Sequence, residues 1–563
     1  MCGICGIASA AGAVDPARLA AMSEALVRRG PDSAGAFVEG GVGLAVRRLE
    51  IVDPGTGDQP VANEDGTVMV VQDGAIYNYS ELRHELERQG HRFRTIGDTE
   101  VLAHLYEQHG DSFVGRLRGM FAVAIWDTRR ERLVLARDRF GIKPLVYRTT
   151  AGELSFASEL RALPRGEIDL DALDCFLAFN SIPAPLTIFD GARKLPPGQL
   201  LLWEDGEARL ERFARPGPVR ADELRTNEDP ELIEELRGRL RDSVRAHLAG
   251  DVPVGALLSG GLDSALLAAL AAEVSSEPLR TFSIGFAGRS VDELAGARLV
   301  AERYGTRHRE LVVRPDVALL LPALADAFDE PCADPSALPT YLVSRLAAED
   351  VKVALSGAGG DELFGSYAAP AAKEVFSREA LTELTGRTAS GAELHARPQD
   401  VDPGLQLVDD LLVKTDRAST AHSLEARVPF LDTVVTNLAF ALPTRHQVRG
   451  LRRPVLLRRA AEPLLPRRIV HGRKRRFSVP AAEWLRGELE PFVRATLSAG
   501  TLRRQGFFRP EAVTRLVDEH VAGAAHRGHR IWALLVFTLW YERHVEGDPG
   551  TAELPEALVE RSA

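Results

Sequence analysis

The spacing of apolar and polar residues divides the chain into two parts. Up to about residue 200, short alternating segments such as TVMVVQDG, MFAVAIWD and ERLVLARD are separated by Gly, Asp and Asn, which predicts antiparallel strands. SELRHELERQG and TEVLAHLYEQHG carry apolar residues at helical spacing, and Ser80 is the expected N-cap of the first helix. We therefore predict an α+β sandwich of stacked antiparallel sheets with helices.

From Asp251 the pattern changes to strands that alternate with helices. DVPVGALLSG leads into LDSALLAALAAE, RTFSIGF precedes VDELAGARLVAERYG, and VKVALSG follows a further helix. This alternation predicts an α/β doubly wound parallel sheet, followed by a mostly helical C-terminal part. A stretch rich in Pro and charge lies between the two parts. The predicted organisation is an N-terminal domain (1–212), a linker (213–232), a second domain (233–545) and a mobile tail (546–563).

Composition narrows the class of protein. A net charge of −11 and a pI of about 5.8 argue against a general binder of nucleic acid or anionic membranes. The most apolar stretch is interrupted by glycines and by Asp263, so it does not predict a transmembrane helix. Four cysteines in 563 residues do not form a disulfide framework, and a cytoplasmic protein is expected.

Two of these cysteines open the chain, in the sequence MCGICG. The spacing of Cys2 and Cys5 is found in redox dithiols and zinc sites, but it also places a thiol beside a free amine once Met1 is removed. Residues three apart on a strand face opposite sides, and Cys175 and Cys332 have no paired spacing that would complete a zinc site. Cys5 is therefore expected to be a small buried apolar residue.

Two glycine loops follow strands of the predicted parallel sheet. In the first, Ser259-Gly260-Gly261-Leu262-Asp263-Ser264, glycines and hydroxyls at a helix N-terminus suit a phosphate. Asp263 would repel that phosphate unless a cation intervened, so Mg²⁺ is implied. The second loop, Ser356 to Glu362, should bring Asp361 to the same sheet edge. The alternative interpretation is a glycine turn before a buried helix.

Together these motifs carry a resemblance to a known family. SGGLDS resembles the pyrophosphate-binding loop of N-type ATP pyrophosphatases. With SGAGGDELFGSY, DRASTAHSLEARVPFLD (Asp416 to Asp432) and RKRRFSVPAAEWLRG (Arg473 to Gly487), the chain resembles the glutamine-hydrolysing asparagine synthetase family from Cys2 to about Tyr541. The resemblance implies an ATP-dependent carbon–nitrogen ligase. Such an enzyme activates a carboxylate, here expected to be aspartate, as an acyl-adenylate with release of pyrophosphate, and ammonia then displaces AMP.

The resemblance also implies roles for residues of the second domain. Leu257 and Ile284 would contact the adenine or ribose of ATP, and Asp263 and Asp361 would hold Mg²⁺. Lys474 would be catalytic by stabilising negative charge at the reacting centre. The implied ATP-binding set is completed by Ser259, Gly260, Gly261, Asp263, Ser264, Ser356 and Gly357.

For the first domain, the resemblance implies a class II glutamine amidotransferase with an N-terminal-nucleophile fold. Cys2 would be the nucleophile, and its α-amine, with an ordinary pKa of about 7.7–8.0, would be the base. Arg48 would pair with the glutamine carboxylate and Asp98 with its ammonium. RRGPDSAG (Arg28 to Gly35) matches a family loop near the nucleophile. The implied glutamine-binding set is Arg48, Leu49, Glu50, Ile51, Val52, Asp73, Gly74, Ala75 and Asp98. The expected partners are small molecules (glutamine or ammonia, and aspartate or another carboxylate) and a second copy of the chain in a homodimer.

The chain departs from the family pattern at three positions. The family has Asn-Gly-Glu where this chain has Asp73-Gly74-Ala75. Asp73 cannot donate to an oxyanion, a loss that costs about 10²–10³ in kcat, and Ala75 cannot pair with the glutamine ammonium. Ala358 replaces a family carboxylate near the acceptor, a role for which the candidates are Glu330, Glu362 and Glu425.

These departures leave three interpretations open. The first is a working asparagine synthetase. The second is a family ligase with another acceptor, such as a β-lactam synthetase or lasso-peptide cyclase, with weak or no glutaminase activity. The third is a non-catalytic paralogue that serves as an interaction partner.

Overall fold

The computed structural model describes residues 2–215, 229–286, 291–313, 320–366, 375–387, 407–442, 455–472, 479–547 and 559–561. Residues 2–215 are called the N-terminal half below, and the remaining described residues the C-terminal half. Residues 473–478, which include Lys474, lie outside the described residues.

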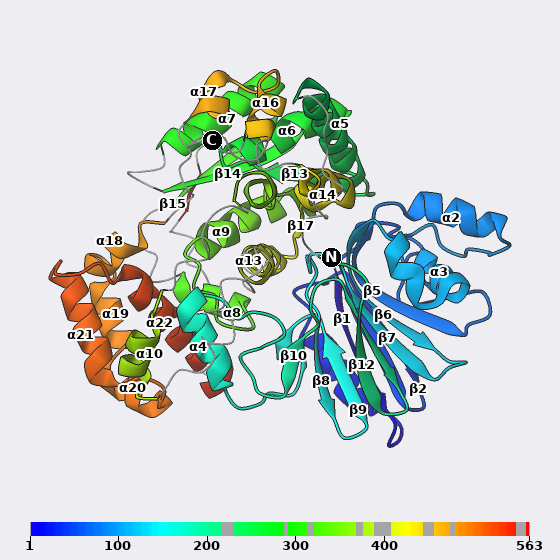
Figure 1. The fold of residues 1–563 in the computed structure, drawn as a ribbon, viewed down its shortest axis with the longest axis horizontal. Coiled ribbons are helices and arrows are strands. Elements are labelled where there is room, and N and C mark those ends of the chain that lie inside the picture. Colours follow the sequence, from blue (N-terminus) through cyan, green and yellow to red (C-terminus); the bar gives the residue numbers. More distant parts are fainter. Residues whose placement is uncertain are drawn as a thin grey trace.

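The N-terminal half is built on two antiparallel sheets that pack face to face (Figure 1). Apolar side chains from both sheets, among them Ile4, Val46, Val71 and Leu135, form the core between them. The first sheet contains, in spatial order, β10 (Ala192–Lys194), β8 (Val146–Thr150), β9 (Glu153–Ala157), β1 (Cys2–Ser9), β3 (Val42–Arg48) and β2 (Ser33–Glu39). The second contains β12 (Glu207–Arg212), β11 (Gln199–Glu204), β7 (Arg132–Arg137), β6 (Gly119–Asp127), β5 (Val68–Ile76) and β4 (Val61–Ala62).

Helices cover the outer face of each sheet. Leu19 of α1 (Pro16–Glu24) and Phe176 of α4 (Leu170–Phe179) pack on the first sheet with Ile7. Leu86 of α2 (Tyr79–Arg88) and Val101 of α3 (Glu100–His109) pack on the second. The short helices η1 (Gly110–Arg116) and η2 (Leu160–Ala162) complete this half. The predicted sandwich of stacked antiparallel sheets with helices is confirmed.

The start of α2 differs from the sequence prediction. The N-cap is Asn78 rather than Ser80, and the carbonyl of Asn78 accepts from the N–H of Leu82. The Asn78 side chain makes no capping bond, because it is bound to the N–H of Arg118 and the carbonyl of Arg116. A long-range contact therefore places the helix start, which the local pattern could not indicate.

The C-terminal half contains a six-stranded sheet with helices on both faces (Figure 1). Its order is β17 (Glu425–Arg427), β16 (Val353–Leu355), β13 (Val254–Leu257), β14 (Arg280–Phe286), β15 (Arg307–Val313) and β18 (Val559–Arg561). All neighbouring pairs from β17 to β15 are parallel. The predicted doubly wound parallel sheet is therefore confirmed.

The two faces of this sheet have separate cores. One face is covered by α5 (Asp229–His247), α6 (Leu262–Val274), α7 (Val291–Tyr304), α14 (Thr433–Phe440), α16 (Val455–Ala461) and α17 (Arg467–His471). The other is covered by α8 (Leu321–Ala327), α9 (Ala337–Ala348) and α13 (Val413–Thr420). Beyond these lie α10 (Arg378–Thr385), α18 (Ala481–Arg486), α19 (Glu490–Thr496), α20 (Ala499–Gln505), α21 (Pro510–Val521) and α22 (Gly528–Tyr541). This half also contains short helical turns: η5 (Glu362–Ser366), η6 (Leu407–Leu412), η7 (Pro429–Leu431) and η8 (Glu542–Glu546). No helix among the described residues is long and apolar enough to cross a membrane.

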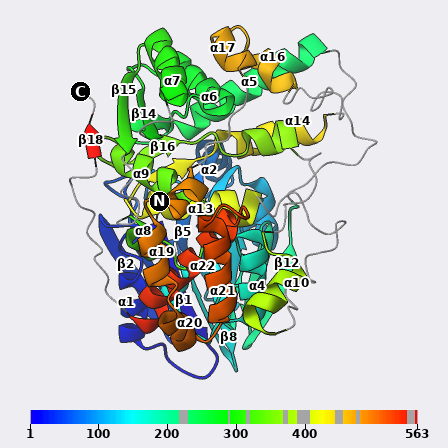
Figure 2. The ribbon, with the colours of Figure 1, turned by 90° about the vertical axis from the view of Figure 1, so that its left-hand side faces the viewer.

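Residues Val559–Arg561, within the predicted tail, form strand β18 of the sheet. Strand β18 pairs antiparallel with β15 along Leu311 to Val313, at the edge visible in Figure 2. An edge strand exposes unpaired backbone groups, and pairing with the tail satisfies them.

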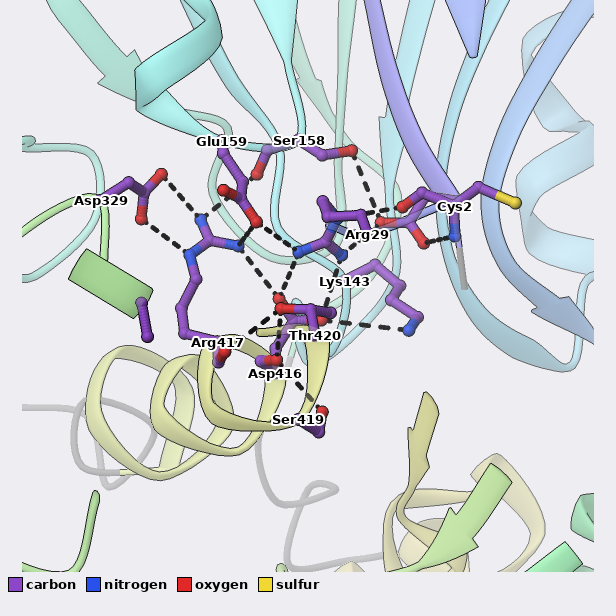
Figure 3. A network of polar contacts seen from close by, with 12 residues as sticks. Cys2, Arg29, Lys143, Ser158, Glu159, Asp329, Asp416, Arg417, Ser419 and Thr420 are labelled. Atoms are coloured by element: carbon purple, nitrogen blue, oxygen red, sulfur yellow. Dashed lines mark hydrogen bonds and ion pairs between the residues drawn. The ribbon is translucent and has the colours of Figure 1, made fainter. Parts of the chain in front are cut away.

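Buried charges join the two halves, as Figure 3 shows. Arg29, which follows α1, is 1% exposed, and its guanidinium contacts three carboxylates. It lies 2.8 Å from Asp73 and 3.1 Å from Glu159 of its own half, and 2.7 Å from Asp416 of α13. Arg417, next to Asp416, binds Asp329 at 2.7 Å. A buried charge without a partner is costly, so this network fixes how the halves meet.

Contacts around this network close the interface further. Arg28 Nη1 donates to Asp326 at 2.6 Å, and Lys352 Nζ donates to Asp32 at 2.7 Å. Arg28 and Asp32 belong to the RRGPDSAG segment, and their partners belong to the C-terminal half. Leu49 and Ile51 pack on Val353 of β16 in a small apolar cluster. The segment that follows Arg48 is thus held by the C-terminal half.

We predict that Asp416→Asn lowers the free energy of unfolding at pH 7 by about 3–5 kcal/mol, because Arg29 then loses a buried partner. Burial raises the pKa of Asp416, but Arg29, Lys143 and Arg417 lower it to about 2, from an ordinary 3.8. A lowered pKa stabilises the fold above the ordinary value, and this contribution is lost as the pH falls towards the folded value. The gap between wild type and variant should therefore shrink between pH 5 and pH 2.5 in urea unfolding.

The matched control is Asp518→Asn, which breaks the exposed pair with Arg494 at 2.8 Å. This change should leave the unfolding free energy nearly unchanged, because exposed pairs are screened by water. Equal losses in the two variants, or a gap for Asp416→Asn that does not depend on pH, would contradict the prediction.

Candidate active site

Cys2 stands at the start of β1, in the sheet that faces the C-terminal half (Figure 1). It pairs with Arg48 at the end of β3, so the two residues lie side by side where these neighbouring strands begin and end. The thiol is buried, and burial raises its pKa. In Figure 3 its sulfur points away from Arg29, on the side opposite the ion network.

Cys5 lies on the other face of the same strand. It packs in a different apolar cluster from Cys2, and burial raises its pKa to about 12. All four cysteines are buried and free of disulfides. This agrees with the expectation that Cys5 is a small buried apolar residue.

A pocket opens beside Cys2 and gathers most of the residues predicted to bind glutamine. Arg48, Leu49, Ile51, Val52, Gly74, Ala75 and Asp98 line it, whereas Glu50 and Asp73 do not. The Glu50 N–H donates to Asp32 at 2.9 Å, within the interface described above.

Arg48 is held in a fixed orientation at this pocket. Its Nη2 donates to the carbonyls of Val52 at 3.0 Å and Asp53 at 2.6 Å, and its Nη1 donates to Asp58 at 3.4 Å. A Cβ on Gly57 would lie 2.6 Å from Nη2, so glycine is needed for this approach. A planar guanidinium fixed in this way suits a carboxylate ligand.

Asp98 is the acidic group of the pocket on the N-terminal half. Its Oδ2 accepts from the N–H of Ile76 at 2.8 Å and from Gln72 Nε2 at 3.1 Å. Burial raises the pKa of Asp98, and these donors oppose that effect. The carboxylate is therefore oriented by its donors toward a cationic ligand group.

Asp73 has partners that sequence reasoning did not consider. Its Oδ1 accepts from the backbone N–H of Cys2 at 2.9 Å, and its Oδ2 accepts from Arg29 at 2.8 Å and more weakly from Ser158 Oγ at 3.5 Å. The carboxylate thus lies on the main-chain side of Cys2. Its negative charge is balanced by Arg29, within the network that crosses to Asp416.

Gly74 allows β5 to lie close to β6 beside the pocket. Its φ is +132°, and a Cβ there would lie 2.0 Å from the carbonyl oxygen of Met120. No other residue fits this position without displacing β6. This explains why glycine stands between Asp73, which faces the network, and Ala75, which faces the pocket.

Two residues of the C-terminal half complete the pocket: Glu425 and Arg427 of β17. Residues two apart on a strand share a face, and Arg427 Nε donates to Glu425 Oε1 at 2.7 Å. Burial would raise the pKa of Glu425, but nearby positive charge, including Arg427 and Lys143, holds it below its ordinary value. Sequence reasoning considered Glu425 only as a replacement for the acid missing at Ala358. The alternation of residue types in SLEARVPFLD could have indicated a strand. Nothing in the local sequence, however, indicates which pocket the side chains of this strand line.

A second candidate site lies where β13 passes into α6. Gly260 has a φ of +76°, which bends the chain between strand and helix. Ser264 Oγ accepts from the Ser259 N–H at 3.1 Å and lies 2.9 Å from Ser259 Oγ. The two hydroxyls are thus fixed at the N-terminus of a thirteen-residue helix. This arrangement suits a phosphate group.

The loop that follows β16 lies against this first loop. A Cβ on Gly357 would be 2.9 Å from the Ser264 nitrogen, and one on Gly360 would be 2.9 Å from Asp263 Cγ. The glycines therefore allow a close approach that places Asp263 beside the turn carrying Asp361. Carboxylates at adjoining turns offer the hard oxygen donors that Mg²⁺ prefers, so these residues fit the ion.

The remaining predicted ATP residues are near the same sheet edge. Leu257 ends β13 and Ile284 lies in the neighbouring β14. Ser356 directly follows β16, and its N–H donates to the carbonyl of Arg427 at 2.7 Å. Strand β17 is therefore bound by its backbone to the second loop, which lies against the first, and lines the Cys2 pocket with its side chains. Lys474 lies outside the described residues.

The three acids considered for the role missing at Ala358 have different surroundings. Glu330 is buried against Lys194, and Glu425 lines the Cys2 pocket. Glu362 Oε2 accepts from the Gly359 N–H at 3.1 Å, within the loop that contains Ala358. Of these three, Glu362 is the one next to the second candidate site.

Comparisons with known proteins agree with this two-site arrangement. Residues 1–214 match the model of a glutamine amidotransferase domain, and residues 235–401 and 405–542 match that of asparagine synthase. The chain is 34% identical to asparagine synthetase [glutamine-hydrolyzing] 1 of Bacillus subtilis, over 93% of each chain. It is 34% identical to a putative asparagine synthetase of Mycobacterium bovis, over 97% of this chain and 98% of that one. It is also 34% identical to asparagine synthetase [glutamine-hydrolyzing] 3 of Arabidopsis thaliana, over 84% and 78%. With two candidate sites joined by β17 and relatives that match along nearly its whole length, the chain belongs to the glutamine-hydrolysing asparagine synthetase family.

Proposed function

We propose that this protein is a glutamine-hydrolysing asparagine synthetase, an ATP-dependent ligase that converts aspartate to asparagine with ammonia taken from glutamine. The observation that carries the proposal is β17, which borders both candidate sites: Glu425 and Arg427 line the Cys2 pocket, and the Arg427 carbonyl binds Ser356. We assign glutamine hydrolysis to residues 1–212 and amide formation to residues 233–545. We further propose a cytosolic homodimer, and the four free cysteines suit a reducing compartment.

In the first site, Cys2 attacks the amide carbon of glutamine after Met1 is removed. Arg48 binds the glutamine carboxylate, and its carbonyl partners keep it in place without an ordering cost on binding. Asp98 and Glu425 bind the ammonium, one from each half of the chain. Glu425 thus supplies a carboxylate to a pocket in which Ala75 replaces the family glutamate.

The α-amine of Cys2 takes the proton of the thiol in this scheme. Once Met1 is removed, the Cys2 nitrogen that now lies 2.9 Å from Asp73 becomes that amine. A carboxylate at this distance stabilises the ammonium form and raises the pKa of the amine, while Arg29 offsets part of the effect. Asp73 therefore weakens the base at neutral pH, in addition to lacking an oxyanion donor.

In the second site, Ser259, Ser264 and the glycine backbone hold the phosphates of ATP, and Leu257 and Ile284 contact its nucleoside. Asp263 and Asp361 hold Mg²⁺, which neutralises phosphate charge when bound. Lys474 stabilises charge at the reacting carboxylate. Pyrophosphate leaves as the aspartate carboxylate bonds to the α-phosphate, and ammonia then displaces AMP. Glu362 is our candidate for the acid that orients the acceptor.

The test of the function is ATP–pyrophosphate exchange. We expect exchange that depends on aspartate, followed by asparagine formation with glutamine or ammonia. Asp263→Asn should lower exchange by at least about 10²-fold, because phosphate charge is then not neutralised. Asp350→Asn, on the surface beside Arg309, is the control that should retain exchange. Exchange with another acid but not with aspartate would contradict the proposed acceptor, and full exchange in Asp263→Asn would contradict the metal assignment.

We predict that Asp73→Asn increases glutaminase activity at pH 7. Removing the charge beside the amine lowers the pKa of that amine, so the acid limb of the pH–rate profile moves to lower pH. A shift of one pH unit corresponds to about tenfold more free amine on that limb. The measurement is ammonia release against pH, with Asp65→Asn, at an exposed site, as the control. An unmoved limb would show that Asp73 does not act on the amine.

We predict that Glu425→Gln raises KM for glutamine by at least about tenfold, because one of two ammonium partners is lost. Ammonia-dependent synthesis should be retained, so the ratio of glutamine- to ammonia-dependent rates falls. The matched control is Glu310→Gln, which also breaks a Glu–Arg pair, with Arg298 at 2.6 Å, but on β15. An equal loss of both activities would mean that Glu425 supports the strand and not the ligand.

A further inference from the structure

A group of four potential metal ligands lies in the N-terminal half, apart from both candidate sites. Glu64 is in the turn between β4 and β5, and His91 follows α2. His104 and Glu107 lie three residues apart on α3, which places them on one helix face. One ligand atom from each of the four falls within 4.8 Å of all the others.

The distances in this group suit a single ion. His104 Nδ1 lies 2.8 Å from Glu64 Oε2, His91 Nδ1 lies 3.2 Å from Glu64 Oε1, and His91 Nδ1 lies 3.9 Å from Glu107 Oε2. Ligand atoms about 2.0–2.1 Å from a tetrahedral zinc ion are about 3.3 Å apart. The observed separations lie on either side of that value, so small side-chain movements would close the shell.

His104 gives independent support for a ligand at this position. Its side chain is 0% exposed, yet neither ring nitrogen makes a hydrogen bond. Glu64 Oε2, only 2.8 Å from Nδ1, is also buried without a hydrogen bond. Two polar atoms that lie this close together without a hydrogen bond between them are placed as two ligands of one metal ion would be. Leaving them buried with no partner would destabilise the fold.

Further groups orient both rings from behind. Glu100 Oε1 lies 3.6 Å from His104 Nε2, and Gln108 Oε1 lies 3.4 Å from His91 Nε2. A carboxylate behind a histidine whose other nitrogen faces the metal is the usual outer shell of a zinc site.

The other polar contacts leave room for an ion. The Arg92 N–H donates to Glu64 Oε1 at 3.1 Å, and Asn63 Nδ2 donates to Glu107 Oε2 at 2.9 Å. Arg94 Nη2 donates to the Glu64 carbonyl at 2.8 Å, so its charge is directed at the backbone. These contacts orient the two carboxylates through Glu64 Oε1 and Glu107 Oε2, and Glu64 Oε2, beside His104 Nδ1, makes no hydrogen bond.

We propose that Glu64, His91, His104 and Glu107 form a structural site for a divalent transition metal of the zinc class. Two imidazoles and two carboxylates suit zinc better than Mg²⁺ or Ca²⁺, which prefer oxygen donors alone. The two carboxylates balance the charge of the ion. Side chains of Glu64 and Glu107 are about one-third and one-quarter exposed, so the ion can enter from solvent.

The site would anchor one wall of the Cys2 pocket. Residues 91–99 run from the first histidine to the pocket residues Thr95, Gly97 and Asp98, and α3 with His104 follows at once. Glu100, which supports His104, also accepts from the N–H of Thr95 at 2.7 Å. A metal at this position would join both ends of the segment that carries Asp98.

The experiment is zinc binding to the full-length protein after chelator treatment, with a competing chromophoric chelator. We expect one equivalent of tightly bound zinc. The double variant His91→Ala/Glu107→Gln, at the exposed side of the group, should bind it at least about tenfold more weakly. The matched control is His84→Ala/Glu87→Gln on α2, which makes the same two substitutions on an exposed helix face and should bind zinc like the wild type.

Two further measurements separate this site from the cysteines. Cobalt bound in place of zinc should lack a thiolate charge-transfer band, and hydrogen exchange across residues 91–104 should slow on zinc addition in wild type but not in the His91→Ala/Glu107→Gln variant. The proposal is overturned if the wild type binds no zinc. It is also overturned if both double variants bind zinc equally, or if cobalt shows thiolate ligation.

Discussion

The Arg29 guanidinium is the charge around which the two halves of the molecule are organised. It is fully buried, and its partners Asp73, Glu159 and Asp416 come from three distant parts of the chain. A cation in such surroundings cannot be left without carboxylates, so the halves can meet only where Asp416 reaches it. The same guanidinium, through its Nε, donates to the Cys2 carbonyl at 3.0 Å. The docking of the halves and the position of Cys2 therefore depend on one side chain.

This arrangement explains why the Cys2 pocket is closed by residues of the C-terminal half. With α13 fixed by Asp416, strand β17 a few residues later is brought over the pocket, where Glu425 and Arg427 complete its lining. The strand is also bound, through Ser356, to the loop that follows β16 beside the second candidate site. A structural change at one site would be transmitted to the other through the backbone of the three-residue strand β17. This coupling suits a reaction in which ammonia made at one site is used at the other.

Much of the fold could be predicted from the sequence, because it follows from local pattern. The alternation of apolar and polar residues predicted the sandwich, and the repeated strand–helix order predicted the parallel sheet. The glycines and hydroxyls of residues 259–264 predicted the loop that suits a phosphate. The pairing of β18 with β15 and the cap at Asn78 depend on contacts far along the chain, which no local pattern contains. The pocket residues of the N-terminal half were predicted from the resemblance to the family and not from local pattern, whereas the contribution of Glu425 depends on how the halves dock.

The ion network around Arg29 gives a physical reason for the aspartate at position 73, where the family has asparagine. Considered alone, an aspartate at this position removes an oxyanion donor and adds a charge near the nucleophile. In the structure that charge is shared with Arg29, whose other partners already reach across the interface, so the carboxylate strengthens the network that joins the halves. An asparagine would leave Arg29 with two carboxylates instead of three. We infer that Asp73 stabilises the interface at the cost of a weaker base at the Cys2 amine, because both effects act through its carboxylate.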